Sequence, residues 1–298
     1  MCYAAGRCGK AATALFRNAT YEVGLARRPR ICRSPGNAIF ASGFPHGSGF
    51  FWGPTFVVWC ALRHFPKRAN PGHNAGVTNP TVEPFSDTTA DEAPVRGYIH
   101  PAEGGGAGFI VLTHGAGGNC KAPLLLALAE HFSAMGVNTL RCDLPFRQRR
   151  PSGPPSPSDA QRDQDGLGRA VLLMRGRFGG RAFLGGVSYG GRQASMLVAD
   201  DPALVEGLLL LSYPLHPPGR PTQLRTAHFS RLQTPVLLVS GTRDAFGTAE
   251  ELQTAIKLIP APAKLVSIEG SGHGLLQKSN RKELPERIVE EFQVFLAS

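Results

Sequence analysis

A serine set between two glycines, in Gly186-Val187-Ser188-Tyr189-Gly190, constrains the fold of this chain more than any other feature. Residues 181–185 before it form a short, mostly apolar segment that predicts a strand, while residues 191–200 carry small and apolar side chains at helical spacing. This context predicts a nucleophile elbow, a tight turn that strains the serine backbone and exposes its hydroxyl at the carboxyl edge of a sheet. Ser188 is therefore the candidate nucleophile, and a structural glycine-rich turn is the alternative interpretation.

From Val95 onward, apolar runs alternate with helical patterns. Strands are predicted at 95–100, 108–113, 137–143, 181–185, 205–212, 235–240 and 264–268, and helices at 123–135, 159–178, 191–200, 250–259 and 284–296. This alternation favours an α/β fold with a mostly parallel central sheet and helices on both faces. The connection from Tyr213 to Thr234 is too short for a sizeable lid domain.

Residues 1–90 show no such regularity, and we expect them to be an N-terminal extension, disordered or poorly packed, before an α/β domain at 91–298. The extension carries ten of the 32 Lys and Arg and three of the 22 acidic residues. The basic character therefore lies mostly outside the α/β domain and does not predict a nucleic-acid partner. An arginine-rich, acid-poor N-terminus is also typical of organelle transit peptides. Residues 39–62 lack charged side chains, but their glycines and prolines argue against a membrane-spanning helix.

The cysteines indicate neither a disulfide framework nor a metal centre. They are Cys2, Cys8, Cys32, Cys60, Cys120 and Cys142. No C-x-x-C pair occurs, and no histidine stands at zinc-like spacing from them. The sequence therefore predicts a protein of a reducing compartment, the cytoplasm, without a metal or a cofactor.

An acid and a base follow the candidate nucleophile in the order that a strand–elbow–helix unit requires. Asp244 comes four residues after the strand predicted at 235–240, and His273 follows the strand predicted at 264–268. In a Ser-Asp-His triad the histidine takes the serine proton and the acid holds the imidazole tautomer. The alternatives are a loop aspartate in a turn and a glycine-flanked loop histidine. Asp143 precedes the nucleophile and fits the order poorly.

The oxyanion donors are expected from two backbone positions. His114-Gly115-Ala116-Gly117 follows the strand predicted at 108–113, where a second donor normally arises. We expect the Ala116 N–H, with the Gly117 N–H as the alternative, to act together with the Tyr189 N–H at the start of the helix.

The substrate is the least constrained part of the prediction. Candidate substrate-binding residues are Arg147, Arg149, Arg192 and His216, with Arg150 and Arg225 on the same expected rim. Arginine binds carboxylate and phosphate groups in a bidentate manner, so this rim favours a small, anionic substrate. Solvated loop arginines are the alternative.

Several strings together resemble one branch of the α/β-hydrolase superfamily. They are Thr113–Gly117, Gly185–Arg192, Tyr213–Gly219, Gly241–Thr248 and Gly272-His273. Over residues 93–298 the chain resembles small hydrolase-like proteins related to the testis-expressed and NSL-complex-subunit proteins. The resemblance implies a single α/β-hydrolase domain with its triad on Ser188, Asp244 and His273. Gly274-Leu275 departs from the branch, in which a polar residue and an aromatic more often follow the histidine.

Two functions follow as expectations. The first is a serine hydrolase, such as a carboxylesterase or another acyl hydrolase, that cleaves an ester, thioester or amide bond through an acyl-enzyme. The second is a catalytically idle hydrolase fold that serves as a binding module or complex subunit, as some relatives do.

Overall fold

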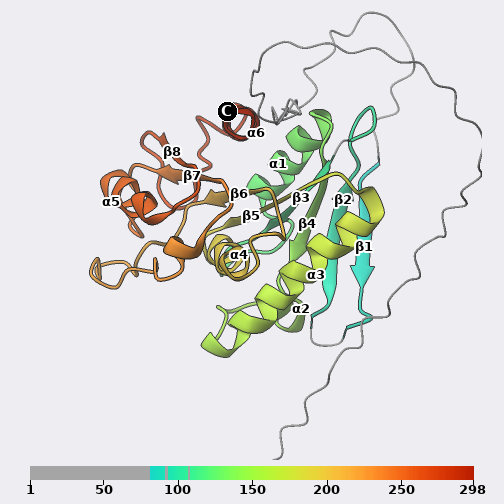
Figure 1. The fold of residues 1–298 in the computed structure, drawn as a ribbon, viewed down its shortest axis with the longest axis horizontal. Coiled ribbons are helices and arrows are strands. Elements are labelled where there is room, and N and C mark those ends of the chain that lie inside the picture. Colours follow the sequence, from blue (N-terminus) through green and yellow to red (C-terminus); the bar gives the residue numbers. More distant parts are fainter. Residues whose placement is uncertain (1–80, 91–92, 107) are drawn as a thin grey trace, which may run out of the picture. The chain divides into compact units, whose positions relative to one another are not determined.

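The computed structural model describes residues 81–90, 93–106 and 108–298, which form a sheet with helices on both faces (Figure 1). The strands are β1 (Glu83–Asp87), β2 (Val95–His100), β3 (Gly108–Thr113), β4 (Asn138–Asp143), β5 (Arg181–Val187), β6 (Gly207–Leu211), β7 (Val236–Gly241) and β8 (Ala263–Ile268). The α-helices are α1 (Pro123–Ala134), α2 (Pro145–Arg149), α3 (Ala160–Phe178), α4 (Tyr189–Asp200), α5 (Ala249–Ala255) and α6 (Glu283–Ala297).

The strands lie in the order β1-β2-β4-β3-β5-β6-β7-β8. β1 and β2 run antiparallel to their neighbours, whereas β4, β3, β5, β6, β7 and β8 pair in parallel. All carboxyl ends of the parallel strands therefore meet at one edge. The predicted α/β class, with a mostly parallel sheet, is confirmed.

Side chains of the central strands point alternately to the two faces of the sheet, so the hydrophobic core has two layers. In β6, Leu208 and Leu210 belong to one hydrophobic cluster, and Leu209 and Leu211 to the other. Successive strand residues point to opposite faces, so a run of four leucines fills both layers. This explains why a continuous apolar run, rather than an alternating one, marks a strand that is covered on both sides.

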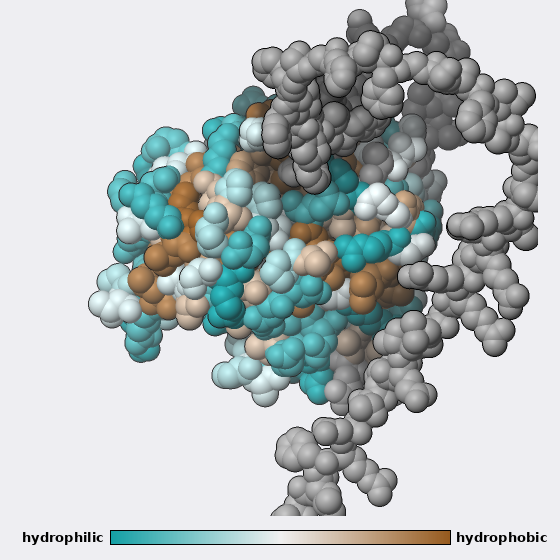
Figure 2. Space-filling model, in the orientation of Figure 1, coloured by the Kyte–Doolittle hydropathy of each residue, from teal (hydrophilic) through white to brown (hydrophobic). Residues whose placement is uncertain are grey.

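Different helices cover the two faces. α1 and α6 pack against each other and against one face, where Phe292 of α6 makes edge-on contacts with Phe132 and Phe183. α3, α4 and α5 bury apolar side chains in the cluster on the other face. Hydrophilic residues occupy much of the surface visible in Figure 2, and hydrophobic residues show between them. No helix within the described ranges is long and apolar enough to cross a bilayer.

The structure differs from the sequence prediction at the first strand. Residues Glu83–Asp87 fall in the predicted extension, yet they pair with β2 in a regular antiparallel register as the sheet edge. The pattern was missed because β1 is an edge strand whose residues are only exposed or half-buried, so it carries no apolar run. The predictions for residues 1–80, including the uncharged stretch at 39–62, lie outside the described residues.

A second difference concerns the proline-rich connection after β4, which was predicted as a loop over 144–158. It contains the short helix α2, which begins with Pro145 in its first turn. Proline suits the first helical turn because its fixed φ and missing N–H cost nothing there. The prolines that follow α2 at 154, 155 and 157 form part of the cavity wall described below.

Candidate active site

Ser188 occupies a strained turn between β5 and α4. Its φ of 51° and ψ of −115° lie in a region that L-residues rarely adopt. A Cβ on Gly186 would lie 2.5 Å from the Gly191 nitrogen, and one on Gly190 would lie 2.3 Å from the His114 carbonyl oxygen. Only glycine fits at these two positions, so the sequence motif records how closely the backbones approach around the serine.

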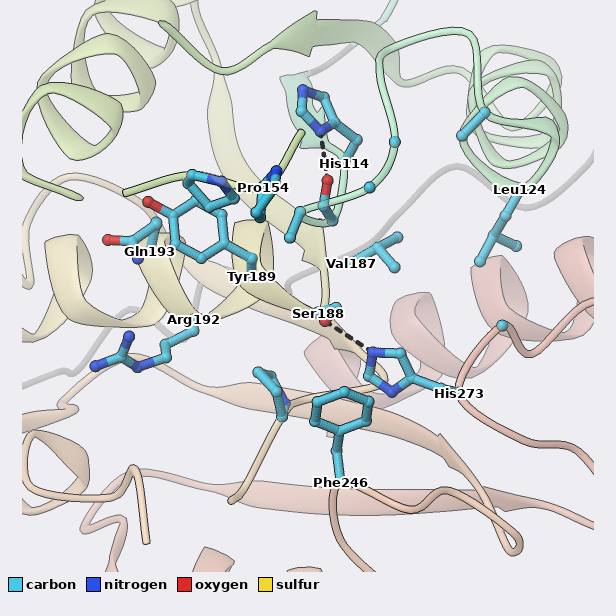
Figure 3. A pocket seen from close by; sticks show the side chains of 18 of the residues that line it. His114, Leu124, Pro154, Val187, Ser188, Tyr189, Arg192, Gln193, Phe246 and His273 are labelled. Atoms are coloured by element: carbon cyan, nitrogen blue, oxygen red, sulfur yellow. Dashed lines mark hydrogen bonds between the residues drawn. The ribbon is translucent and has the colours of Figure 1, made fainter. Parts of the chain in front are cut away.

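A chain of hydrogen bonds joins Ser188 to His273 and Asp244. The Ser188 Oγ lies 2.8 Å from the His273 Nε2, and the Asp244 carboxylate oxygens lie 2.8 and 3.0 Å from the His273 Nδ1 (Figure 3 shows the Ser188–His273 contact). These side chains come from the ends of β5, β7 and β8. The structure thus brings together the three residues that the sequence singled out, in the order nucleophile, base and acid.

The acid and the base are held on several sides. The Asp244 side chain is fully buried, and its Oδ1 also accepts a hydrogen bond from the Phe246 N–H at 2.9 Å. The Phe246 ring lies against the His273 imidazole, with centroids 4.2 Å apart. Sequence reasoning gave Phe246 no role, although it stands in the distinctive 241–248 string, because its contact with His273 joins two distant loops.

The loop that follows β3 lies directly over the serine. A Cβ on Gly115 would lie 3.3 Å from the Ser188 Cβ, and both Ala116 and Gly117 line the same cavity as Ser188. Tyr189 is the first residue of α4, so its N–H has no partner one turn earlier in the helix. The candidate oxyanion donors are therefore gathered around the serine hydroxyl.

The His114 ring, at the start of this loop, is held in one tautomer by its two hydrogen bonds. Its Nε2 accepts a hydrogen bond from the Leu144 N–H at 3.1 Å, which places the proton on Nδ1. The Nδ1–H then donates to the Gly115 carbonyl at 2.8 Å. Burial lowers the pKa of His114 below its ordinary value, so the ring stays neutral at physiological pH.

Arg147 lies outside the wall of the cavity at Ser188, which does not support the predicted substrate contact. Its side chain is buried and donates to the carbonyl oxygens of Ala116, Gly118 and Gly153 at 2.7, 2.8 and 3.0 Å, and to that of Arg150 at 3.2 Å. The guanidinium instead fastens the loop after β3 to the loop after α2. The sequence could not show this, because the acceptors are backbone groups that any residue type provides.

Arg149 and His216 also lie outside the cavity wall. Arg149 pairs with Asp159, as does Arg150. The His216 Nδ1 lies 2.9 Å from the Pro217 carbonyl oxygen and its Nε2 lies 3.2 Å from a Glu251 carboxylate oxygen, and these partners raise its pKa. These contacts within the protein do not support the predicted substrate contacts of Arg149 and His216, which stay predictions.

A cavity of about 970 Å³ opens at the serine. Apolar groups form much of its wall, including Leu124, Val187, Met196, Phe246, Leu276 and the prolines at 154, 155, 157 and 214. Arg192 and Arg225 lie in the same wall. Of the arginines that the sequence singled out, these two are the ones that reach the cavity.

A second serine–histidine pair, Ser195 and His228, lies away from the cavity wall. The Ser195 Oγ is 2.8 Å from the His228 Nε2, but both residues are buried and Ser195 also donates to the Arg192 carbonyl. Burial lowers the pKa of His228 to about 4. Substrate has no access to this pair, which serves the packing between α4 and the connection before β7.

Within the described residues, no cluster of three histidine, cysteine, aspartate or glutamate side chains could hold a metal ion. The chemistry that the arrangement offers rests on a serine hydroxyl, an imidazole, a buried carboxylate and backbone N–H groups. Such a set can activate a hydroxyl for attack on a carbonyl carbon and stabilise the resulting oxyanion.

Comparison with known proteins agrees with this architecture. The fold is similar to an alpha-beta serine hydrolase homologue from Coxiella burnetii (18% identity, TM-score 0.57, covering 70% of this chain and 96% of that one). It is also similar to dienelactone hydrolase from Anabaena variabilis (18% identity, TM-score 0.57, covering 72% of this chain and 98% of that one). A third similar structure is Est1E from Butyrivibrio proteoclasticus (18% identity, TM-score 0.57, covering 72% of this chain and 99% of that one). A family model described as "Alpha/beta hydrolase domain" matches residues 106–295, more than half of the chain. The chain therefore belongs to the alpha/beta hydrolase domain family.

Proposed function

We propose that this protein is a serine hydrolase that cleaves an ester bond, with thioesters and amides as related substrates, through an acyl-enzyme. The observation that carries the proposal is the continuous hydrogen-bonded chain Ser188–His273–Asp244, with its serine in a strained turn at a large cavity. A hydroxyl in this setting has a base at 2.8 Å to take its proton.

Acylation would begin when the His273 Nε2 removes the Ser188 proton and Oγ attacks the substrate carbonyl carbon. The buried Asp244 carboxylate stabilises the imidazolium that forms, and it keeps the ring oriented through Nδ1. The tetrahedral intermediate then collapses. His273 returns the proton to the departing alcohol oxygen, and the acyl group stays on Ser188.

The negative charge of the intermediate would be met by the Tyr189 N–H and by the Ala116 or Gly117 N–H. In a trans peptide the C=O and N–H point in opposite directions. The Gly115 carbonyl is held by the His114 ring and the Ala116 carbonyl by Arg147, so both loop N–H groups have fixed directions before substrate binds. Such preorganised donors contribute to catalysis because no reorganisation is needed when the charge develops.

Deacylation repeats the sequence with water. His273 takes a proton from water, the oxygen attacks the acyl carbon, and the second tetrahedral intermediate releases the carboxylic acid as Ser188 recovers its proton. The net reaction adds one water across the ester bond. Every step uses groups of this chain, and none needs a cofactor.

The comparisons support a hydrolase in general terms, since the similar structures include a serine hydrolase homologue and a dienelactone hydrolase. The narrower resemblance to the testis-expressed and NSL-complex-subunit branch stays a prediction. So does a cytoplasmic location, with which the free thiols of Cys120 and Cys142 are in keeping.

A fluorophosphonate probe on the full chain tests the proposal. We expect covalent labelling that mass spectrometry maps to Ser188 and that Ser188→Ala abolishes. Ser195→Ala is the matched control, because Ser195 also contacts a histidine but is buried away from the cavity, and it should still label. Folded wild-type protein that stays unlabelled and hydrolyses no 4-nitrophenyl ester would instead identify an idle hydrolase fold used for binding.

A further inference from the structure

Two arginines in the cavity wall have no acidic partner among the residues that the structure describes. Arg192 comes from the first turns of α4 and Arg225 from the connection between β6 and β7. Among the described residues, the cavity wall contains no aspartate, glutamate or lysine. Its formal charge is therefore carried by two guanidinium groups alone, in surroundings that are otherwise mostly apolar.

Six other arginines of the domain are paired with an acid. Ion pairs to aspartate or glutamate are made by Arg149, Arg150, Arg169, Arg177, Arg181 and Arg231. By contrast, the Arg225 side chain donates only through Nη1, to the Pro214 carbonyl at 3.2 Å, and the Arg192 guanidinium makes no hydrogen bond within the described residues. The terminal nitrogens of Arg192 and the second terminal nitrogen of Arg225 therefore have no partner in the described part of the protein.

The positive charge of Arg192 acts on Arg225. The pKa of Arg225 is lowered, first by burial and then by the positive charge of Arg192. Placing like charges together in a half-buried wall destabilises the unliganded protein. A carboxylate or phosphate would offset this cost, because each guanidinium offers a planar pair of donors that matches such an oxyanion.

The direction from Ser188 to Arg192 indicates which part of a substrate carries the anion. In Figure 3, Arg192 extends to one side of Ser188, while His273 and Leu124 lie on the other. The leaving alcohol must lie near His273, since that imidazole protonates it. The acyl chain then runs to the opposite side, toward the arginines.

We propose that Arg192 and Arg225 form an anion subsite that binds a carboxylate, or a phosphate, at the far end of the substrate's acyl chain. The inference rests on the proposed serine hydrolase and narrows its substrate class. The preferred substrate is an ester whose acyl chain ends in an oxyanion, such as a half-ester of a dicarboxylic acid. Its leaving alcohol occupies the apolar part of the cavity beside Leu124 and Leu276.

Paired ester substrates test the subsite. The 4-nitrophenyl half-esters of glutaric to suberic acid, whose second carboxylate is free, are compared with the same compounds in which that carboxylate is a methyl ester. A further series that ends in a phosphonate distinguishes a preference for carboxylate from one for phosphate. At the best chain length, wild type should favour the anionic ester in kcat/KM by on the order of 10- to 100-fold, the range expected of charge-assisted hydrogen bonds. Arg192→Gln and Arg225→Gln should each reduce this ratio at least several-fold, and the double variant should abolish it.

Arg220→Gln is the matched control, because it removes the same charge from the same connection at an exposed position outside the cavity wall. This variant should keep the wild-type ratio. Arg192→Lys keeps the positive charge but lacks the planar pair of N–H donors, so it should retain part of the preference for the anionic ester. Equal kcat/KM for capped and uncapped esters in wild type at every chain length would overturn the proposal, as would a ratio that Arg192→Gln and Arg225→Gln leave unchanged.

A binding measurement separates this inference from the proposed hydrolysis. Adipate and inorganic phosphate are added to Ser188→Ala protein, whose thermal midpoint is followed with and without the Arg192→Gln and Arg225→Gln changes. An anion-dependent rise in the midpoint that needs both arginines supports the subsite even if the fluorophosphonate probe finds no reactive serine. A labelled Ser188 with no anion preference and no such rise leaves the hydrolase proposal standing and rejects the subsite.

Discussion

At the scale of single residues, Asp244 and Asp143 present a direct contrast. Asp244 contacts the imidazole of His273, whereas the Asp143 Oδ1 accepts a hydrogen bond from the Cys120 N–H and lies 3.5 Å from the His114 Nε2. Both are aspartates at the carboxyl ends of parallel strands, so the chemistry of the side chain does not distinguish them. Their hydrogen-bond partners distinguish them.

Asp244→Asn should lower kcat by on the order of 10³–10⁴-fold with the fold retained, because the amide favours the wrong imidazole tautomer. Asp143→Asn should leave kcat within about tenfold of wild type and cost mainly stability, by loosening the loop at Cys120. Steady-state kinetics and urea unfolding of both variants decide the matter. Full activity in Asp244→Asn with none in Asp143→Asn would reverse the assignment of the acid.

Arg147 is a positioning residue, because it acts on the loop over Ser188 through the carbonyls of Ala116 and Gly118. Arg147→Gln should lower kcat by on the order of 10- to 100-fold, since misplaced oxyanion donors cost this much, and should change KM little. A purely structural role would lower the thermal midpoint but leave kcat per folded molecule intact at low temperature. Arg149→Gln, on the same short helix but paired with Asp159, is the control and should keep kcat.

At the scale of secondary-structure elements, the junction of β5, α4 and the β3 loop depends on glycine. Gly190 allows α4 to approach the His114 carbonyl, and no side chain of any size fits there. Gly176, on an exposed part of α3, has nothing within 4 Å of an added Cβ and no unusual φ. The same substitution should therefore have opposite effects at the two positions.

Gly190→Ala should destabilise the protein by about 1–3 kcal/mol, the usual cost of overpacking, and should also reduce turnover because the elbow shifts against the loop. Gly176→Ala should stabilise it by about 0.5–1 kcal/mol, because glycine in a helix interior costs backbone entropy. Urea unfolding midpoints measure both. A Gly190→Ala protein as stable and as active as wild type would show that the backbone approach at the elbow is looser than described.

At the scale of the whole molecule, buried histidines couple stability to pH. Burial lowers the pKa values of His100 and His228 to about 4, and it also lowers that of His114. In the unfolded chain these rings titrate near ~6.5. Below that pH unfolding takes up protons, so a stabilisation that is complete above about pH 6.5 is lost as the pH falls toward 4.

The free energy of unfolding should therefore drop between pH 7.5 and pH 5, by on the order of 1–2 kcal/mol for each of His100 and His228. His100→Gln should flatten the pH dependence, because it removes one of the rings that are buried as neutral groups. Chemical unfolding at several pH values provides the measurement. An unfolding free energy that stays constant from pH 7.5 to 5 would contradict the expectation that these rings are buried as neutral groups.

The sequence by itself determined the α/β class, the elbow at Ser188 and the three residues that meet there. These features are encoded locally. Apolar runs mark buried strands, close backbone approach demands glycine, and the nucleophile, acid and base each follow a strand whose end must lie at the same edge. Asp244 and His273 could be found because their order along the chain already implies where the strand ends bring them.

Only the tertiary structure decided what the arginines do, and it placed β1 and Phe246. Arg147 and Arg149 looked equivalent in the sequence to Arg192, yet the first binds backbone carbonyls and the second an aspartate, while the third faces the cavity. A guanidinium on a long side chain takes whichever partner packing brings within reach. That choice depends on contacts between loops far apart in the chain, and no local pattern records them.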